Sequence, residues 1–162
     1  MVALLIIAAI SVVLLCLWPI AIGGAPYVPT PPDVIRHALR LAQVQPGETV
    51  VDLGCGDGRV LRLAAQEFGA VGVGIEVNPL WVWWARWRCR GLPVTVQWGR
   101  LEQADLSGAD VVYLFLAPAV WPRLTSRLAG LRPAVRLVSY GFALPNRVAQ
   151  VEAGNCYLYR RA

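Results

Sequence analysis

The feature that most constrains this chain is a run of three alternating glycines between an apolar strand and a helical stretch. Residues 50–59 read VVDLGCGDGR, so that Gly54, Gly56 and Gly58 are separated by single residues. Glycine tolerates positive φ and has no Cβ, so a ligand can approach the backbone closely. A strand, a glycine turn and a helix in this order are typical of the carboxyl edge of an open α/β sheet, where ligands bind. The alternative is a tight turn without a ligand.

Two acidic residues narrow the kind of ligand. The loop departs from GxGxxG, because its third glycine comes one residue early, and it lacks the GK[ST] of a P-loop, so pyrophosphate is disfavoured. Asp52 precedes the first glycine, and its negative charge suits a cation better than a phosphate. Glu76 ends the next apolar stretch, where a carboxylate can accept both ribose hydroxyls. A positively charged nucleoside without phosphate, S-adenosylmethionine, meets these conditions.

At these positions the chain resembles the class I S-adenosylmethionine-dependent methyltransferases. Residues 52–58, DLGCGDG, match their motif I, (D/E)xGxGxG, and Glu76 matches the acid that closes their second strand. The resemblance implies a Rossmann-like fold with S-adenosylmethionine as the cofactor, the loop against its methionine part and sugar, and Glu76 on the ribose. The residues thereby assigned to cofactor binding are Thr30, Asp52, Gly54, Cys55, Gly56, Gly58, Glu76, Val77 and Asn78.

A narrower resemblance extends from Tyr27 to Arg160. It is carried by APYVPTPPDVIRHAL, DLGCGDGRV, GIEVNPLWVWWARWR, VSYGF and CYLYR. These segments are similar to the small archaeal protein-lysine methyltransferases and to the mitochondrial membrane-anchored enzymes that methylate lysines of the ATP synthase c subunit and the adenine nucleotide carrier. The resemblance implies that residues 27–30, YVPT, help to form the cofactor and lysine site, and that the partner is a lysine-bearing protein.

A lysine acceptor must lose its proton before it can take a methyl group. An aromatic, poorly hydrated slot lowers the pKa of an amine because it disfavours the ammonium form. Tyr27, Tyr140 and Phe142 are the candidates for lining such a slot. The alternative for these three is an ordinary place in the core or at the rim.

Other motifs exclude some activities. Residues 99–102, GRLE, stand where class I enzymes usually present a hydrogen-bond acceptor for the adenine amine. Arg100 cannot accept a hydrogen bond, so Glu102 or a backbone group would have to be the acceptor. LFLAP at 114–118 lacks the NPPY-type tetrad of adenine- and glutamine-directed enzymes, so these substrates are disfavoured. The single His and the four Cys, none in CxxC spacing, predict no metal site and no disulfide framework.

Apolar strands and helical stretches alternate along the rest of the chain. We expect strands at 49–53, 71–76, 94–98, 111–116 and 134–140, helices at 58–68, 79–90 and 121–131, and a terminal hairpin of 147–152 with 156–160. Such alternation predicts an α/β fold with a mostly parallel central sheet, helices on both faces and a C-terminal antiparallel hairpin.

Residues 1–32 carry no charge, and residues 2–22, VALLIIAAISVVLLCLWPIAI, are long enough for a transmembrane helix. We interpret 1–24 as a membrane anchor, 25–32 as a Pro/Gly linker and 33–162 as the methyltransferase domain. A cleaved signal peptide is the main alternative, although no Lys or Arg precedes Arg36, and a buried core helix is another. Because Arg36 and Arg40 follow the span, the positive-inside rule places the domain in the cytoplasm, on a single-pass membrane protein.

Two local expectations complete the picture. Thr30 is expected to cap a helix that begins at Pro31, with Asp33 in its first turn. Trp81, Trp83, Trp84 and Trp87 crowd the helix after Glu76; we expect half of them to pack in the core, and a membrane-facing or protein-binding surface is the alternative.

Taken together, these features predict a methyltransferase that N-methylates lysines of a protein near the membrane, either a membrane or a ribosomal protein, with no specific nucleic acid partner. The 15 basic residues are all Arg, for which a solvated surface is favoured over a nucleic-acid or lipid site. The alternatives are an enzyme that methylates a lipid or quinone at the bilayer and a noncatalytic adaptor that binds the cofactor or a partner. The intact Asp52, glycines and Glu76 argue against the adaptor.

Overall fold

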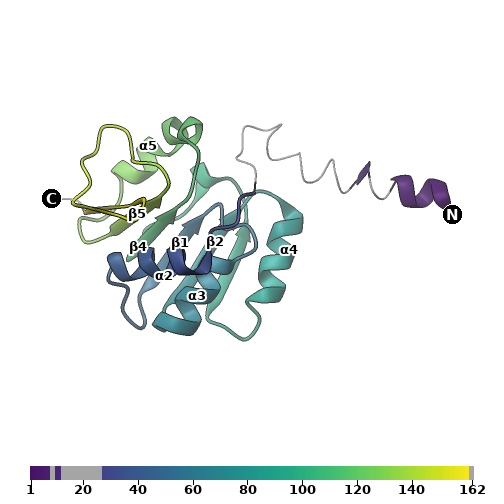
Figure 1. The fold of residues 1–162 in the computed structure, drawn as a ribbon, viewed down its shortest axis with the longest axis horizontal. Coiled ribbons are helices and arrows are strands. Elements are labelled where there is room, and N and C mark those ends of the chain that lie inside the picture. The colour runs from purple at the N-terminus through teal and green to yellow at the C-terminus, as the bar shows by residue number, and fades with distance from the viewer. Residues whose placement is uncertain (8–9, 12–26, 161–162) are drawn as a thin grey trace.

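The computed structural model describes residues 1–7, 10, 11 and 27–160. The described residues form a seven-stranded sheet in the order β3-β2-β1-β4-β5-β7-β6 (Figure 1). The strands are β1 (Thr49–Leu53), β2 (Val71–Glu76), β3 (Val94–Trp98), β4 (Val111–Leu114), β5 (Arg136–Tyr140), β6 (Val151–Ala153) and β7 (Cys156–Arg160).

The strand directions confirm the predicted mostly parallel sheet. β1 pairs in parallel with β2 and β4, β2 with β3, and β4 with β5. β7 is antiparallel to both β5 and β6. Gly154 and Asn155 both have positive φ, as a two-residue hairpin turn between twisted strands requires. β6 begins at Val151, four residues later than predicted, and the side chain of Arg147, in the segment before it, donates from Nη2 to the carbonyl of Leu128 at 3.1 Å.

Helices cover both faces of the sheet, as predicted. They are α2 (Pro32–Leu41), α3 (Arg59–Phe68), α4 (Pro79–Arg88) and α5 (Trp121–Ala129), with short 3₁₀ turns η1 (Leu101–Gln103) and η2 (Pro118–Val120). α4 and α5 each end two residues before their predicted ends. Figure 1 shows α4 at the β3 end of the sheet and the β6–β7 hairpin at the opposite end.

Successive side chains of β1 pack on opposite faces of the sheet. Val50 packs in the cluster that contains Ile35 and Leu39 of α2, whereas its neighbour Val51 packs in the cluster of Leu124 on α5. Successive side chains of a strand point to opposite faces, so an apolar strand such as β1 supplies both layers of core. The buried strand predicted at this position is confirmed.

The cap predicted at Thr30 is wrong. α2 begins at Pro32, and its N-cap residue is Pro31, with no side-chain capping bond. Because a residue before proline is pushed out of the helical region, Pro32 holds Pro31 in an extended conformation at ψ 143° and delays the helix by one residue. Thr30 is buried instead, beside the glycine loop.

The predicted anchor lies largely outside the described residues. Residues 2–7 and 10–11 are helical. Within the described part of the chain, no helix combines the length and the apolar character needed to cross a bilayer.

The strand order places a topological switch at β1. The chain moves from β1 to β2 and β3 on one side and then returns to β4 on the other side of β1. In open α/β sheets the loops that diverge at such a point leave a crevice beyond the carboxyl ends of the strands. The glycine loop follows β1, so the fold brings it to this crevice.

Candidate active site

A cavity of about 420 Å³ lies at this carboxyl edge, within the usual size range of small-molecule sites. It is lined by residues from the loops after β1, β2, β3, β4 and β5 and by residues 27–30, which we call the N-terminal strap. Among the predicted site residues, those that line it are Tyr27, Thr30, Asp52, Gly54, Cys55, Gly56, Glu76, Val77, Tyr140 and Phe142.

The glycine loop turns away from β1 through positive φ angles of 83° at Gly54 and 51° at Gly56. The N–H groups of Gly54 and Cys55 both donate to the carbonyl of Ile75, at 2.8 and 3.1 Å, which fixes the loop to the end of β2. A Cβ on Gly56 would lie 2.8 Å from the ring of Tyr27. Gly56 therefore allows both the turn and the close approach of the strap.

Glu76 is buried at the end of β2 and is oriented by the backbone. Its Oε2 accepts from Gly56 N at 2.9 Å and its Oε1 from Asn78 N at 2.8 Å. Burial raises the pKa of Glu76, and the hydrogen bonds from the backbone amides act in the opposite direction. Since each carboxylate oxygen can accept more than one hydrogen bond, the side chain retains capacity for the two hydroxyls of a ribose.

Asp52 lies in the cavity wall with only 3% of its surface exposed. None of the Arg residues in the described part of the chain forms an ion pair with it. Burial, with contributions from the charges of Glu76 and Asp57, raises the pKa of Asp52 to about 8. A cationic ligand in the cavity would stabilise the ionised carboxylate.

Asp57 and Arg59 fasten the N-terminal strap to the glycine loop. Arg59 Nε donates to Asp57 Oδ1 at 2.9 Å, while Nη1 donates to the carbonyl of Thr30 at 3.1 Å and Nη2 to Tyr27 Oη at 2.9 Å. Asp57 also forms an ion pair with Arg88 of α4. Although burial alone would raise it, the pKa of Asp57 is lowered by the hydrogen bonds and charge of Arg59 and by the charge of Arg88.

Aromatic side chains form a further part of the wall. Tyr27 stacks on Trp81 of α4, with ring centroids 4.0 Å apart. The rings of Tyr140 and Phe115 lie 4.7 Å apart, and the hydroxyl of Ser139 donates to the carbonyl of Phe142 at 2.6 Å, which shapes the loop after β5. The structure therefore brings Tyr27, Tyr140 and Phe142 to one cavity, and their role around a lysine stays a prediction.

Two residues predicted to bind the cofactor have other places. Gly58 does not line the cavity; it precedes α3 at φ 75°, and a Cβ there would lie 3.1 Å from Ala85 Cβ and from Cys89 Sγ. Gly58 thus allows α3 and α4 to pack closely. Asn78 does not line the cavity either, because its Oδ1 caps α4 by accepting from Leu80 N at 2.9 Å.

The segment after β3 faces the cavity with Arg100 and Leu101. Glu102 does not line the cavity, and its carboxylate pairs with Arg123 of α5. Of the two adenine acceptors considered from the sequence, the carboxylate is thus engaged elsewhere, and the backbone near Leu101 is the group available to the cavity.

Sequence reasoning missed Arg59 and Trp81. Arg59 directly follows the glycine motif and stands two residues after Asp57 in the sequence. This position was the available signal, because one Arg side chain can donate to several groups at once, as Arg59 does to Asp57, Thr30 and Tyr27. Trp81 was assigned no role in the site, and only the path of the strap across α4 reveals its contact with Tyr27.

Solved structures define the class of this protein. One described as an RNA methyltransferase from Salinibacter ruber in complex with S-adenosyl-L-homocysteine is 38% identical, with a TM-score of 0.75, and the match covers 82% of this chain and 92% of that one. A methyltransferase from Geobacter sulfurreducens, also with S-adenosyl-L-homocysteine, has a TM-score of 0.60 at 23% identity over 72% of this chain and 52% of that one, and shows the fold alone. The protein is a class I S-adenosylmethionine-dependent methyltransferase.

The sequence comparisons identify the family within this class. Residues 52–151 match the family described as the ANTKMT methyltransferase domain, and the chain belongs to this family. A protein-lysine N-methyltransferase of Saccharolobus islandicus is 38% identical over 148 residues, 83% of this chain and 92% of the relative. The adenine nucleotide translocase lysine N-methyltransferase of Mus musculus is 39% identical over 127 residues, 74% of this chain and 54% of the relative.

The chain spans nearly the whole archaeal relative but only about half of the mouse relative.

The residues present fit S-adenosylmethionine. The carboxylate of Glu76 lines the cavity at the end of β2, Gly54 and Gly56 form part of its wall, and the buried Asp52 has no cationic partner among the described residues. When bound, the cofactor supplies an electrophilic methyl group on a sulfonium. The chain itself orients the reactants and excludes water, which is the main contribution of a protein to an in-line displacement.

Proposed function

We propose that this protein N-methylates lysine side chains of a protein substrate close to a membrane. The observation that carries the proposal is the aromatic wall of the cavity beside the cofactor residues, together with the lysine-methylating activity named for the archaeal and mouse relatives.

The aromatic wall suits a neutral amine. Tyr27, Tyr140 and Phe142 surround the cavity with ring surface, and Phe115 extends it. Such a surrounding disfavours an ammonium ion and so favours the deprotonated lysine that can accept a methyl group. At the cofactor side of the same cavity, the carboxylates of Asp52 and Glu76 instead favour a positively charged ligand.

The proposed location rests on the N-terminal sequence. Residues 2–22 form an uncharged apolar run, and Arg36 and Arg40 follow it. Insertion of this run as a single transmembrane helix would tether the domain at the cytoplasmic surface. A membrane or ribosomal protein would then be the substrate within reach.

Transfer of tritium from labelled S-adenosylmethionine to membranes tests the proposal. We expect label in the protein phase, released as methyl-lysine on acid hydrolysis, and none with Glu76→Ala, because the ribose contact is lost. Since this chain contains no Lys, protein label cannot come from its own side-chain amines. Label confined to the RNA fraction, the substrate named for the Salinibacter ruber protein, would contradict the proposal.

A second candidate function is methylation of a quinone or lipid at the bilayer. The demethylmenaquinone methyltransferase of Tropheryma whipplei is 32% identical over 120 residues, 69% of this chain and 49% of that protein. The apolar cavity wall would also receive such a ring. In the same assay this function predicts label in the organic phase alone, which would refute lysine methylation.

A further inference from the structure

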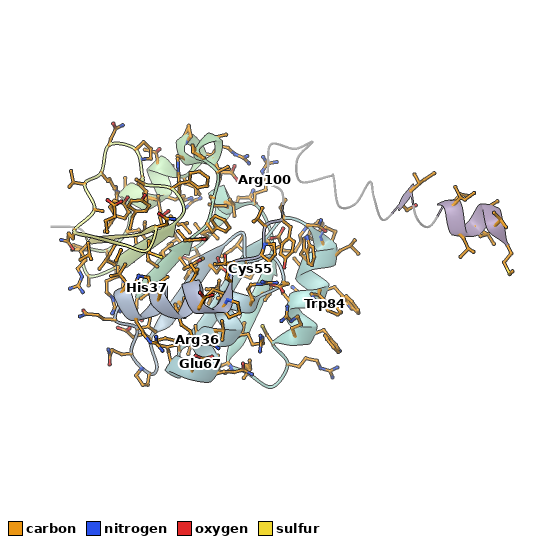
Figure 2. All side chains as sticks on the ribbon, viewed as in Figure 1. Arg36, His37, Cys55, Glu67, Trp84 and Arg100 are labelled. Atoms are coloured by element: carbon orange, nitrogen blue, oxygen red, sulfur yellow. The ribbon has the colours of Figure 1, made fainter. Side chains whose placement is uncertain are left out.

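Helix α4 has an apolar face on each side. Its inner side carries the buried Val82 and Ala85, which pack with Leu61 of α3 and Val96 of β3. Its outer side carries apolar residues at helical spacing that remain exposed: Leu80 at 39%, Trp83 at 64%, Trp84 at 37% and Trp87 at 52%. We call these four residues the outer tryptophan face. Figure 2 shows Trp84 on the side of α4 that points away from the sheet.

This finding corrects the expectation that half of the tryptophans of this helix pack in the core. None of Trp81, Trp83, Trp84 and Trp87 is buried, because the small residues Ala85 and Val82 already fill the space against the sheet. The exposed rings instead pack on one another, with centroids 4.9 Å apart for Trp84 and Trp87 and 6.0 Å apart for Trp83 and Trp84. They form one continuous aromatic surface.

The chemistry around the outer tryptophan face favours lipid. Residues 79–90, PLWVWWARWRCR, contain no acidic residue, and Arg90 is exposed one turn after Trp87, whereas Arg86 donates its Nε to the carbonyl of Val96 at 2.9 Å. Tryptophan is enriched where membranes meet water, since one part of the indole is apolar and its N–H is polar. Arginine beside it adds attraction to anionic headgroups.

The path of the chain brings the same helix toward the proposed membrane segment. Tyr27 stacks on Trp81, so the strap enters the domain at α4. Residue 22 ends the apolar run, and five peptide units then reach Tyr27, at most about 17 Å of fully extended chain. If residues 2–22 lie in a bilayer, α4 cannot be far from its surface.

We propose that the outer tryptophan face docks on the interface of an anionic bilayer. The inference rests on the proposed membrane insertion of residues 2–22 but adds a second contact, which fixes how the domain is oriented. The cavity rim formed by Tyr27 and Trp81 is then held beside the lipid surface, where an acceptor residue that emerges from the membrane can enter.

Quenching of tryptophan emission by brominated lipid tests the docking. The full chain is reconstituted in vesicles of phosphatidylcholine and anionic phosphatidylglycerol with bromine on the acyl chains. We compare it with a Trp83→Phe/Trp87→Phe variant, which retains apolar rings but removes two of the seven tryptophans. Docking predicts that the quenched fraction of the emission falls in this variant.

Trp121→Phe is the matched control. Trp121, the first residue of α5, is 4% exposed and packs in the core away from the surface, so its removal should raise the quenched fraction instead of lowering it.

Flotation of the same vesicles separates the two proposals. Protein that floats and shows an equal or larger quenched fraction in the Trp83→Phe/Trp87→Phe variant would keep the anchor and overturn the docking. Protein that does not float would overturn both. Rings shielded from aqueous iodide yet not quenched by bromine would also overturn the docking, in favour of a second protein surface.

Discussion

Asp52 near the end of β1 and Asp57 in the glycine loop lie five positions apart and are both buried, yet only Asp57 forms ion pairs among the described residues. Asp57 is held by Arg59 and Arg88, and these cations keep its pKa low against the effect of burial. Asp52 has no such partner among the described residues, and burial raises its pKa to about 8.

The difference separates a structural carboxylate from one that serves the ligand. A buried charge without a partner costs free energy, and a protein retains it where something else supplies the counter-charge. Asp57 has its counter-charges within the fold and uses them to fasten the strap. Asp52 has the cavity in front of it, so its counter-charge is expected from the bound sulfonium nucleoside.

The largest effect is expected from Asp52→Asn on cofactor affinity. Loss of one buried charge partner should weaken binding of S-adenosylmethionine, which carries the sulfonium charge, by about 3–4 kcal/mol, between roughly 100- and 1,000-fold. Calorimetric titration measures this. Affinity within a few-fold of wild type would mean that Asp52 does not serve the ligand.

The second expectation concerns stability against pH without ligand. An unfolded Asp titrates near about 4, whereas Asp52 in the fold titrates at about 8. The folded state therefore holds the extra proton between these values, and stability falls as pH rises through this window.

Relative to wild type, Asp52→Asn should thus gain roughly 3–4 kcal/mol of unfolding free energy as pH rises from about 5 to about 8. Urea unfolding at several pH values measures the difference. A constant difference across this range would contradict the raised pKa.

Asp57→Asn should act on the fold more than on the ligand. It leaves Arg59 and Arg88 without their shared carboxylate, and we expect a loss of about 2 kcal/mol in unfolding free energy at neutral pH. Because the pKa of Asp57 is lowered, this difference from wild type should shrink as pH falls below about 4. Unfolding in urea is again the measurement, and an unchanged midpoint at pH 7 would contradict the role.

The smallest effect is expected from Arg59→Lys. Lysine keeps the charge beside Asp57 but cannot hydrogen-bond to Asp57, Thr30 and Tyr27 at once. The free energy that holds the strap against the glycine loop should therefore fall by about 1 kcal/mol. Exposure of the strap should rise, seen as faster amide exchange at residues 27–30, with global stability nearly unchanged. Equal exchange in both proteins would show that Arg59 does not fasten the strap.

The contrast also shows what the sequence could predict. The glycine spacing and the acid at the end of β2 are local patterns, and they predicted which edge of the sheet carries the site and where Glu76 lies. The alternation of strands and helices, also local, predicted the parallel sheet. The pairing of Asp57 with Arg88 and the hydrogen bond from Arg59 to Tyr27 could not be predicted, because the two residues of each pair lie about thirty positions apart on different elements.

The tryptophans of α4 show the same limit. Nothing in the sequence of α4 distinguishes a tryptophan that packs inward from one that is exposed, since both faces are apolar. The packing of Val82 and Ala85 against Val96 decides which face is buried. Asn78, assigned to the cofactor, is the N-cap of α4 in the structure, and its role toward the cofactor stays a prediction.

Proton release on cofactor binding tests the central claim most directly. At pH 6.5 Asp52 is protonated in the free protein, and a bound cation should ionise it, so calorimetry in buffers of different ionisation enthalpy should show about one proton released per S-adenosylmethionine bound. We predict this release for wild type and for Asp57→Asn, and its loss in Asp52→Asn. Equal release in wild type and Asp52→Asn, or none in wild type, would contradict the assignment of Asp52 to the ligand.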